Sequence, residues 1–594
     1  MKGHYLIFFL VILFSCQTKE NKTQSTASEN RPNVILIMTD DQGYGDLGFH
    51  GNPHIKTPVL DSLARTSTRF TSFYVSPVCA PTRSSLMTGR HSLRTGIRDT
   101  YNGGAIMADS EVTIAEILKE NGYRTGMFGK WHLGDNYPFR PEDQGFDETV
   151  WHASGGIGQV GDVKNYYAFD SSYFDPELIR NGVFFKSKGY CSDVYTDEAL
   201  HFIDQENDDP FFIYLSFNAP HTPLQLPKSS YEMYQDVQVD AGSHMQKGYP
   251  VREMSDRDID AARKVYGMVS NIDDNLGRLF NHLNKKGLAE NTIVIFLTDN
   301  GPQQNRYNGG LRGRKGMVYE GGVKVPFFIS YGNKIPKDQN VDIPGAHIDV
   351  LPTLLSLCDI ESTNISNPID GKDLKPLIYG ESVTWADRPL FFHWQRGFPE
   401  PYRNVAVRKG DYKLVGNTAH HANVEDFELF NLAEDPYESV NLNLQLPDKV
   451  NELRSLFDDW YNNVIKEDNL VAFPRIPVGT EHENPVLLNR NDAKGAKGIW
   501  NQDLIYGYWD VSVEETGSYD VRCYFRENVK NSGRLKVRLG SIQRSKDHAD
   551  TLTRLVEIEN IELQKGNYQL ETWFREHKKW QNVHFPFYVE IEKK

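Results

Sequence analysis

The segment "NVILIMTDDQG" at residues 33–43 is a run of apolar residues that ends abruptly in two aspartates. A short and almost wholly apolar run is typical of a strand buried on both faces, as in a parallel sheet covered by helices. Asp40 and Asp41 then fall at the carboxyl end of that strand. The segment therefore predicts a central strand that delivers two acidic groups to one edge of a sheet.

The same pattern recurs three more times along the chain. Each time an apolar run stops in polar residues that can bind ions or move protons. The runs are "GYRTGMFGKWHLG", which ends with Lys130 and His132, "PFFIYLSFNAPHTP", which ends with His221, and "NTIVIFLTDNGPQ", which ends with Asp299 and Asn300.

Helical patterns lie between these strands, at residues 57–70, 111–122 and 258–287. Alternation of strands and helices predicts an α/β sheet that is covered by helices on both faces. In such sheets ligands bind beyond the carboxyl ends of the strands, so the polar residues above should meet although they are far apart in sequence.

The acidic members of this set predict a metal site. Asp40, Asp41, Asp299 and Asn300 offer only oxygen ligands, which hard divalent cations prefer. No zinc-type Cys/His spacing competes with them. The Lys, His and Arg residues nearby suit a doubly charged tetrahedral anion held against the metal.

Cys79 stands in the segment "VCAPTRSSLMTGR" at residues 78–90. Pro81 near a first turn and Gly89 as a stop predict a short helix with the thiol at its N-terminus, where anions are favoured. The residue could be a buried structural thiol, a nucleophile, a metal ligand or the precursor of another group. Because a thiolate is a poor partner for a hard cation, an oxygen species in place of the sulfur is indicated.

Residues 31–465 resemble the type I sulfatases of the alkaline phosphatase superfamily. "CAPTRSSLMTG" matches the family's C-x-P-x-R signature, and further matches follow in order along the chain. These are "GKWHLG", "APHTP", "TDNG", "LRGRKGMVYEGGVKVP", "HIDVLPTLL", "AVRKGDYKLV" and "LFNLAEDPYESVNL". The resemblance implies an alkaline-phosphatase-like α/β sandwich with a large mixed sheet between helices, and a smaller C-terminal α+β subdomain with an antiparallel sheet.

The resemblance also implies the chemistry of the site. Cys79 would be oxidised to formylglycine by a formylglycine-generating enzyme or an anaerobic maturase, and the hydrated aldehyde would attack sulfur. One Ca²⁺ ion would bind this residue together with the four oxygen ligands named above. Arg83, Lys130 and His132 would contact the hydrate, and His132 would assist loss of sulfate. His221 and Lys315 would bind the sulfate, and one of them would protonate the departing alcohol.

The chain divides into five predicted parts. Residues 1–16 have the layout of a secretory signal, and "LFSC" resembles a lipobox that would lipidate Cys16, with ordinary cleavage or an uncleaved anchor as the alternatives. Residues 17–30 are polar and predict a flexible tether. The catalytic domain would span 31–385, and the smaller subdomain and linker 386–483. Alternating strands at 484–594 predict an accessory β-sandwich that serves either packing or carbohydrate binding.

The net charge and the predicted export signal limit the binding partners that the sequence allows. A formal net charge of −15 argues against nucleic-acid binding, which needs a surplus of Lys and Arg. Contact with a membrane would come only through the lipid anchor. The protein would be exported to the periplasm or to the outer membrane or surface of a bacterium.

The expected substrate is a sulfated oligo- or polysaccharide, such as ulvan, carrageenan oligosaccharides or a glycosaminoglycan. A phosphate mono- or diester hydrolase and a non-catalytic glycan-binding lipoprotein are the alternatives. Cations of one loop could bind further anionic groups, and loop aromatics and bases could contact a sugar. These candidates are Arg306, Arg312, Arg314, Tyr101, Trp151, His152, His393, Trp394 and Arg396.

Overall fold

The computed structural model describes residues 31–239, 253–361, 367–418, 420–496, 498–529, 531–549, 553–579 and 581–594. The predicted signal, Cys16 and the tether lie outside the described residues. Within the described part of the chain, no helix has both the length and the apolar character needed to cross a membrane.

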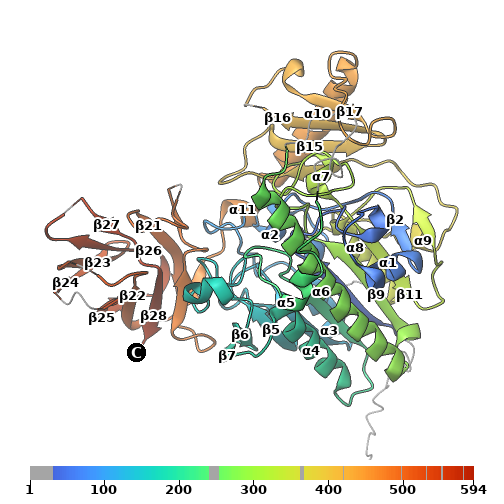
Figure 1. Cartoon of the computed structure of the whole chain (residues 1–594). Coiled ribbons are helices and arrows are strands. Elements are labelled where there is room, and N and C mark those ends of the chain that lie inside the picture. The colour runs from blue at the N-terminus through green and yellow to red at the C-terminus, as the bar shows by residue number, and fades with distance from the viewer. Residues whose placement is uncertain are drawn as a thin grey trace, which may run out of the picture.

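A ten-stranded mixed sheet forms the centre of the catalytic domain (Figure 1). Its five middle strands run parallel, and the outer strands include antiparallel pairs. The order is β12 (Gln339–Val341), β2 (Thr68–Phe70), β11 (Phe327–Tyr331), β9 (Thr292–Thr298), β1 (Asn33–Thr39), β8 (Phe211–Ser216), β4 (Arg124–Lys130), β5 (Glu148–His152), β6 (Glu177–Arg180) and β7 (Val183–Lys186).

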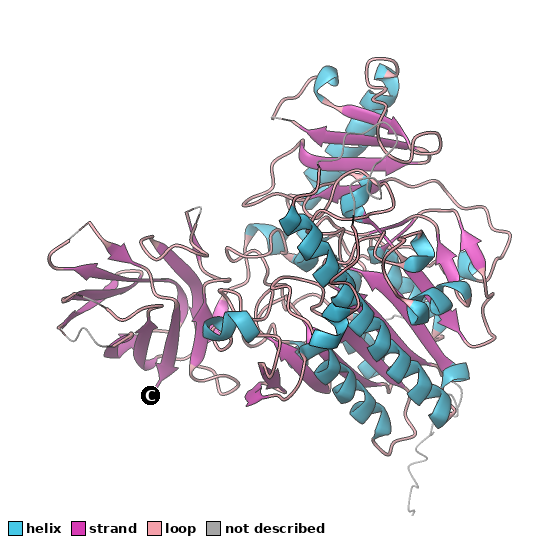
Figure 2. Cartoon of the chain, in the orientation of Figure 1, coloured by secondary structure: helices cyan, strands magenta, loops and turns pink. Residues whose placement is uncertain are grey.

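Helices cover both faces of this sheet (Figure 2). Alternate residues of β1 enter different cores: Leu36 packs in one apolar cluster and Ile37 in the other, as the period of two in a strand requires. The helices of the first cluster are α2 (Cys79–Thr88), α3 (Ile114–Glu120), α8 (Val350–Leu357) and α9 (Lys375–Ile378), and those of the second are α1 (Pro58–Arg65), α4 (Cys191–Asp204) and α6 (Asp256–Lys286).

The helix predicted at residues 57–70 is too long. The structure ends α1 at Arg65, and β2 follows at Thr68–Phe70. The apolar residues that α1 buries stop at Ala64, and the β-branched Thr68 favours the extended conformation that pairs with β11 and β12. The short elements α5 (Lys228–Glu232), α7 (Glu320–Val323), β3 (Phe73–Tyr74), β10 (Lys324–Val325) and β13 (Gly345–Ala346) complete this part of the chain.

The smaller subdomain is an antiparallel sheet of four strands with one long helix against it. The helix α10 (Pro447–Val464) buries Val450, Leu453 and Phe457 against strand residues such as Val407 and Leu429. The strands are β14 (Leu390–His393), β15 (Arg403–Lys409), β16 (Tyr412–Asn417) and β17 (Glu428–Asn431), and α11 (Asp468–Val471) follows α10.

The C-terminal part is a sandwich of two sheets, which Figure 1 shows in orange and red beside the catalytic domain. β18 lies before the predicted domain start at residue 484 and pairs with β21, so the sandwich uses part of the segment predicted as a linker. One sheet contains β18 (Ile476–Val478), β21 (Gly507–Val513), β26 (Gly566–Glu576), β23 (Gly533–Leu539) and β24 (Ile542–His548), with β20 (Lys494–Gly495) and β27 (Val583–His584) at its sides. The other contains β19 (Val486–Asn489), β28 (Tyr588–Lys593), β22 (Gly517–Tyr524) and β25 (Leu555–Leu563).

The sandwich shares apolar and polar contacts with the catalytic domain. Ile106 and Phe139 of the catalytic domain belong to the apolar core cluster of the sandwich. The Asn489 amide donates to Asp135 over 2.8 Å, and the Glu483 carboxylate accepts from the Tyr137 amide over 2.7 Å. The sandwich is therefore docked against the catalytic domain through a shared apolar core and partly buried hydrogen bonds.

Candidate active site

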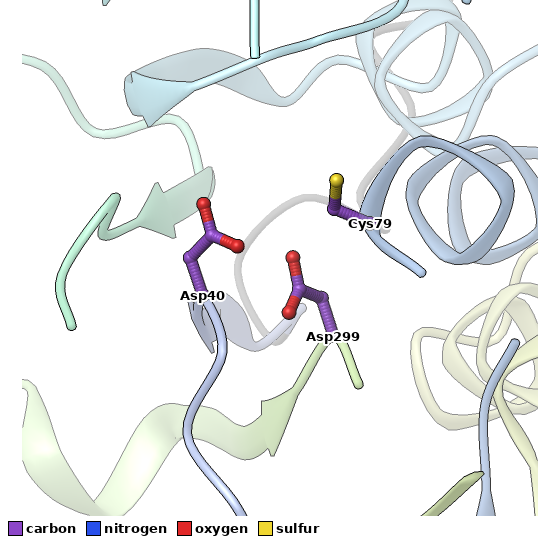
Figure 3. Close-up of side chains that lie close together, drawn as sticks. All are labelled: Asp40, Cys79 and Asp299. Atoms are coloured by element: carbon purple, nitrogen blue, oxygen red, sulfur yellow. The ribbon is translucent and has the colours of Figure 1, made fainter. Parts of the chain in front are cut away.

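Side chains from separate strand ends meet at one point beyond the carboxyl edge of the central sheet. Figure 3 shows Asp40, Cys79 and Asp299 turned toward one another from three segments. One ligand atom of each lies within 4.8 Å of the others, and Asp40, Asp41 and His221 form a second such group. The predicted convergence of the polar strand ends is therefore present in the structure.

The sheet register explains why the carboxylates meet. β1 and β9 are parallel neighbours with Thr39 opposite Thr298, so the next residue of each strand is an aspartate at the same edge. Asp41 and His132 then adopt φ angles of 64° and 61°. Left-handed backbone is uncommon for residues other than glycine and is concentrated at functional sites.

Three cations balance the three buried carboxylates. Lys130 donates to Asp40, Arg83 donates to Asp299 over 2.8 Å, and Lys315 lies 2.5 Å from the Asp41 carboxylate. Five of these side chains are fully buried. A buried charge without a partner is energetically very unfavourable, so each carboxylate needs its cation and each cation needs its carboxylate.

Arg83 also joins three strand ends. Its guanidinium donates to the Lys130 carbonyl over 3.0 Å and to the Ser216 hydroxyl over 2.5 Å, besides the bond to Asp299. β4 and β8 approach so closely here that only glycine fits at residue 129. A Cβ at Gly129 would lie 1.8 Å from the Ser216 carbonyl oxygen. Arg83 thus fixes the ends of β4, β8 and β9 relative to one another.

The acidic cluster fits a divalent cation. Asp40 Oδ1, Asp41 Oδ2 and Asn300 Oδ1 are buried and have no hydrogen-bond partner. Buried oxygens without a partner are rare in native proteins, and an unplaced ion is one of the usual reasons. Oxygen ligands with net negative charge suit Ca²⁺ or Mg²⁺ rather than zinc.

Asp41 and Asp299 of the cluster differ in pKa. Burial raises the pKa of Asp41, but the charges of Lys315 and His221 together with the hydrogen bonds from Lys315 and Asn300 outweigh burial and hold this pKa well below its usual range. Burial and the neighbouring Asp40 raise the pKa of Asp299 to about 7. The carboxylates repel each other when no cation lies between them.

His132 faces the sulfur of Cys79. Its Nδ1 lies 3.4 Å from Sγ, and its Nε2 donates to the Thr100 carbonyl over 2.9 Å. Because Nε2 carries the proton, Nδ1 is the acceptor, and burial with the nearby Lys130 keeps the pKa of His132 well below its usual value. Burial also raises the pKa of Cys79, so the unmodified residue is a neutral thiol and a poor metal ligand.

His221 lies on the other side of the carboxylates. Its Nδ1 donates to the Thr222 carbonyl over 2.7 Å, which leaves Nε2 facing Asp41 at 3.7 Å. Burial and the charge of Lys315 lower the pKa of His221 to about 3 in the ligand-free protein. His221 is therefore neutral in the ligand-free protein.

A cavity of about 710 Å³ opens above these groups. The residues that form its floor are Cys79, His132, His221 and Lys315. The residues that we call its outer wall are Tyr101, Trp394, Arg396 and Trp500. Its volume lies within the range of small-molecule sites, and it exceeds what one sulfate group fills.

The structure separates the predicted substrate-binding residues into two groups. Tyr101, Arg314, Trp394 and Arg396 line the cavity. The other candidates do not line this cavity. Trp151 and His152 are fully buried, Arg306 pairs with Asp46, and Arg312 lies 3.9 Å over the Tyr319 ring and pairs with Glu428. His393 also lies outside the lining.

Among the lining residues that the sequence did not predict, Asn491 and Trp500 come from the sandwich. No motif marks them. The only signal was a tryptophan in a Gly- and Asn-containing stretch, "GIWNQD" at residues 498–503, which is typical of a surface loop.

A parallel sheet whose strand ends gather a buried acidic cluster beside a helix N-terminus fits the class of metal-dependent hydrolases that act on anionic esters. More specifically, the chain belongs to the sulfatase family. Residues 32–360 match the family model described as Sulfatase, and residues 313–464 match the model described as N-sulphoglucosamine sulphohydrolase, C-terminal.

Characterised relatives agree with this assignment. The chain is 30% identical over 481 residues to N-acetylgalactosamine-6-sulfatase of Sus scrofa, covering 73% of this chain and 85% of that protein. It is 30% identical over 446 residues to an ulvan-active sulfatase of Formosa agariphila, covering 72% and 80%. The crystal structure of Ps i-CgsB in complex with k-i-k-neocarrahexaose is similar with a TM-score of 0.63 and 28% identity, over 75% of this chain and 98% of that one.

The protein is therefore a sulfuric ester hydrolase. Membership of the family implies a formylglycine residue and a divalent metal ion, and the buried acidic cluster fits the metal. The assignment favours a sulfatase over the phosphate ester hydrolase and the non-catalytic glycan-binding lipoprotein that the sequence left open.

Proposed function

We propose that this sulfatase removes sulfate groups from a sulfated oligo- or polysaccharide. The observation that carries the proposal is the cavity of about 710 Å³ with aromatic and cationic walls above the buried site. Aromatic faces and cations suit the apolar ring faces and the charges of sulfated sugars. The names of the relatives, an ulvan-active sulfatase and a complex with neocarrahexaose, support ulvan and carrageenan as substrate classes, with glycosaminoglycans as the third.

We assign the metal site to Ca²⁺. Asp40, Asp41, Asp299 and Asn300 would hold the ion, and three of them have a buried oxygen without another partner. When bound, the ion would polarise the sulfate ester and stabilise negative charge.

We assign the nucleophile position to residue 79, with the Cys79 thiol oxidised to the aldehyde of formylglycine by a maturation enzyme of the cell. The side chain lies in the first turn of a buried helix, where anions are favoured. The overall reaction consumes one water, because the sulfate ester and water become an alcohol and hydrogen sulfate.

His132 is the base that faces residue 79. Its Nδ1 can hold a proton from that residue, because its Nε2 proton is fixed by the Thr100 carbonyl. Lys130 donates to the Asp40 carboxylate and Arg83 donates to the Asp299 carboxylate, so the two cations orient these carboxylates on this side of the site.

His221 and Lys315 serve the leaving group. Both line the cavity beside Asp41, so they can contact the sulfate and the departing oxygen. We assign the proton for the leaving alcohol to Nε2 of His221, the ring nitrogen that the Thr222 carbonyl leaves free. The negative charge of the bound sulfate ester would raise the pKa of His221 from its low ligand-free value.

We further propose that the protein is exported by its N-terminal segment. Residues 1–16 would act as the signal, Cys16 would receive lipid and residues 17–30 would tether the enzyme in the periplasm or at the outer membrane. A surface location suits a polysaccharide substrate that is too large to enter the cell.

Protein expressed with a maturation enzyme tests the proposal. Sulfate release would be measured on ulvan, carrageenan and glycosaminoglycan oligosaccharides, on 4-nitrophenyl sulfate and on 4-nitrophenyl phosphate. We expect release from at least one sulfated saccharide, an aldehyde mass at residue 79, and activity that chelation removes and Ca²⁺ restores. Full activity with an unmodified thiol, or a preference for the phosphate, would contradict it.

A further inference from the structure

The sandwich contributes part of the active-site cavity. Trp500 and Asn491 line the cavity together with floor residues such as His132. Both residues lie beyond residue 464, where the matched family segments end. This part of the wall is therefore a feature of the chain's own C-terminal domain.

Trp500 belongs to a continuous row of aromatic and cationic side chains. The ring centroids of Trp500 and Tyr101 are 6.1 Å apart. The Arg396 guanidinium lies 4.4 Å from the centroid of Tyr101 and 4.9 Å from that of Trp394. The row combines the catalytic domain, the smaller subdomain and the sandwich on one side of the cavity.

The loop that carries Trp500 is fixed in place. Ile499 is only 1% exposed and anchors the loop in the core of the sandwich. Arg526 donates to the carbonyls of Trp500 and Asn501, each over 3.0 Å. A rigid aromatic side chain loses little conformational entropy when a ligand binds, so it is suited to recognition.

The same loop region contacts the segment that holds Tyr101. The Gly103 amide donates to the Asn491 carbonyl over 3.1 Å, and the Gly495 amide donates to the Asn102 side chain over 3.1 Å. Docking of the sandwich therefore sets the distance between Trp500 and Tyr101.

The indole N–H groups of the row have no partner of their own. Nε1 of Trp500 and Nε1 of Trp394 are both buried and make no hydrogen bond. An unpaired buried donor costs free energy until it meets an acceptor. Sugars offer hydroxyl oxygens next to an apolar C–H face, and tryptophan offers the matching polar tip and apolar ring.

We propose that Trp500, with Tyr101, is a stacking platform for a sugar ring next to the sulfated sugar. The inference rests on the proposed function and deepens it. The floor takes the sulfate group, so the rest of the substrate extends toward the outer wall, where the platform lies. The enzyme would then distinguish sulfated oligosaccharides from small sulfate esters through a residue of the sandwich.

The variant Trp500→Ala tests this platform. For a sulfated oligosaccharide that the wild type cleaves, we expect kcat/KM to fall roughly tenfold or more, mainly through KM. For 4-nitrophenyl sulfate, which has no second sugar ring to stack on the platform, we expect a change below about twofold. Trp500→Phe keeps an aromatic face and should recover most of the oligosaccharide activity.

Trp573→Ala is the matched control, because Trp573 belongs to the same sandwich but does not line the cavity. It should leave both substrates unchanged. Equal losses on both substrates for Trp500→Ala, or no loss on either, would overturn the platform. A wild type that releases sulfate from no substrate would instead overturn the proposed function.

Discussion

The floor and the outer wall of the cavity are built in opposite ways. The floor rests on fully buried ion pairs, such as Arg83 with Asp299, and its residues come from the catalytic domain alone. The outer wall is partly exposed and combines three parts of the chain, with Trp394 from the smaller subdomain and Trp500 from the sandwich. The chemistry of the site and its selectivity therefore depend on different regions.

This difference has a physical basis. Parallel strands must end at one edge of the sheet, so the register of β1 and β9 alone places two aspartates together. Loops that meet across domains follow no such rule and can change without disturbing the core. We expect variants of the floor and of the ion pairs beneath it to slow the reaction itself, and variants of the wall to change which substrates are cleaved.

The largest effect is expected from Asp40→Asn, which removes one charge from the acidic cluster beneath the floor with little change in volume. Asp40 Oδ1 has no protein partner, and Asp40 Oδ2 accepts from Lys130. Loss of this carboxylate should weaken metal binding and leave Lys130 buried without its anion. Because a metal ion contributes several kcal/mol to such a transition state, we expect turnover of every substrate to fall by at least about a thousandfold.

Metal content and single-turnover rates measure this effect, and thermal unfolding checks the fold. Asp492→Asn is a suitable control, because Asp492 is also buried but belongs to the sandwich. It should keep the metal. An Asp40→Asn protein that retains both metal and activity would remove Asp40 from the site.

The floor could be predicted from the sequence because its signals are local. The apolar run before Asp40 predicts a strand from a few neighbouring residues, and Gly89 predicts the end of a helix in the same way. The structure has β1 and α2 at those positions. The contacts of Arg83 with Ser216 and the Lys130 carbonyl could not be predicted, since they depend on how three strands are ordered in the sheet.

The outer wall could not be predicted for a different reason. The residue type and the loop position do not determine the direction in which a side chain points. Arg312 forms an ion pair with Glu428 and lies over the Tyr319 ring, whereas Arg314 lines the cavity. Trp500 reaches the cavity only because the sandwich docks on the catalytic domain. Docking depends on whole surfaces, which no local pattern encodes.

A smaller and selective effect is expected from His221→Ala. A sugar alkoxide needs a proton as the S–O bond breaks, whereas a nitrophenolate leaves with little help. We expect single-turnover rates to fall about 100- to 1,000-fold on the sulfated sugar and less than about tenfold on 4-nitrophenyl sulfate.

His132→Ala provides the contrast, because His132 faces residue 79 rather than the leaving group. Its loss should slow the two substrates alike, in a step that follows departure of the alcohol. If His221→Ala also slows both equally, the proton for the leaving group comes from Lys315 instead.

The smallest effect concerns the junction that brings the wall to the floor. Asp162 of the catalytic domain and Asp492 of the sandwich are 1% and 5% exposed. Burial raises the pKa of Asp162 to about 7. Burial and the nearby Asp135 raise the pKa of Asp492 well above its usual value, and one oxygen of Asp492 has no hydrogen-bond partner. The junction therefore holds carboxyl groups that resist ionisation.

These shifts predict that Asp492→Asn stabilises the protein at alkaline pH. The folded pKa of Asp492 lies above the unfolded value near 4, so its protonated form supports folding below about pH 4 and this stability is lost as pH rises. The amide never ionises, so at pH 8 the variant should unfold a few degrees higher than the wild type, a gain of about 1–3 kcal/mol. The difference should shrink toward pH 5 in thermal unfolding, while turnover of 4-nitrophenyl sulfate stays within about twofold. A variant less stable than the wild type at pH 8 would contradict this prediction. It would mean that Asp492 is ionised and that an ion pair of its carboxylate stabilises the junction between the sandwich and the catalytic domain.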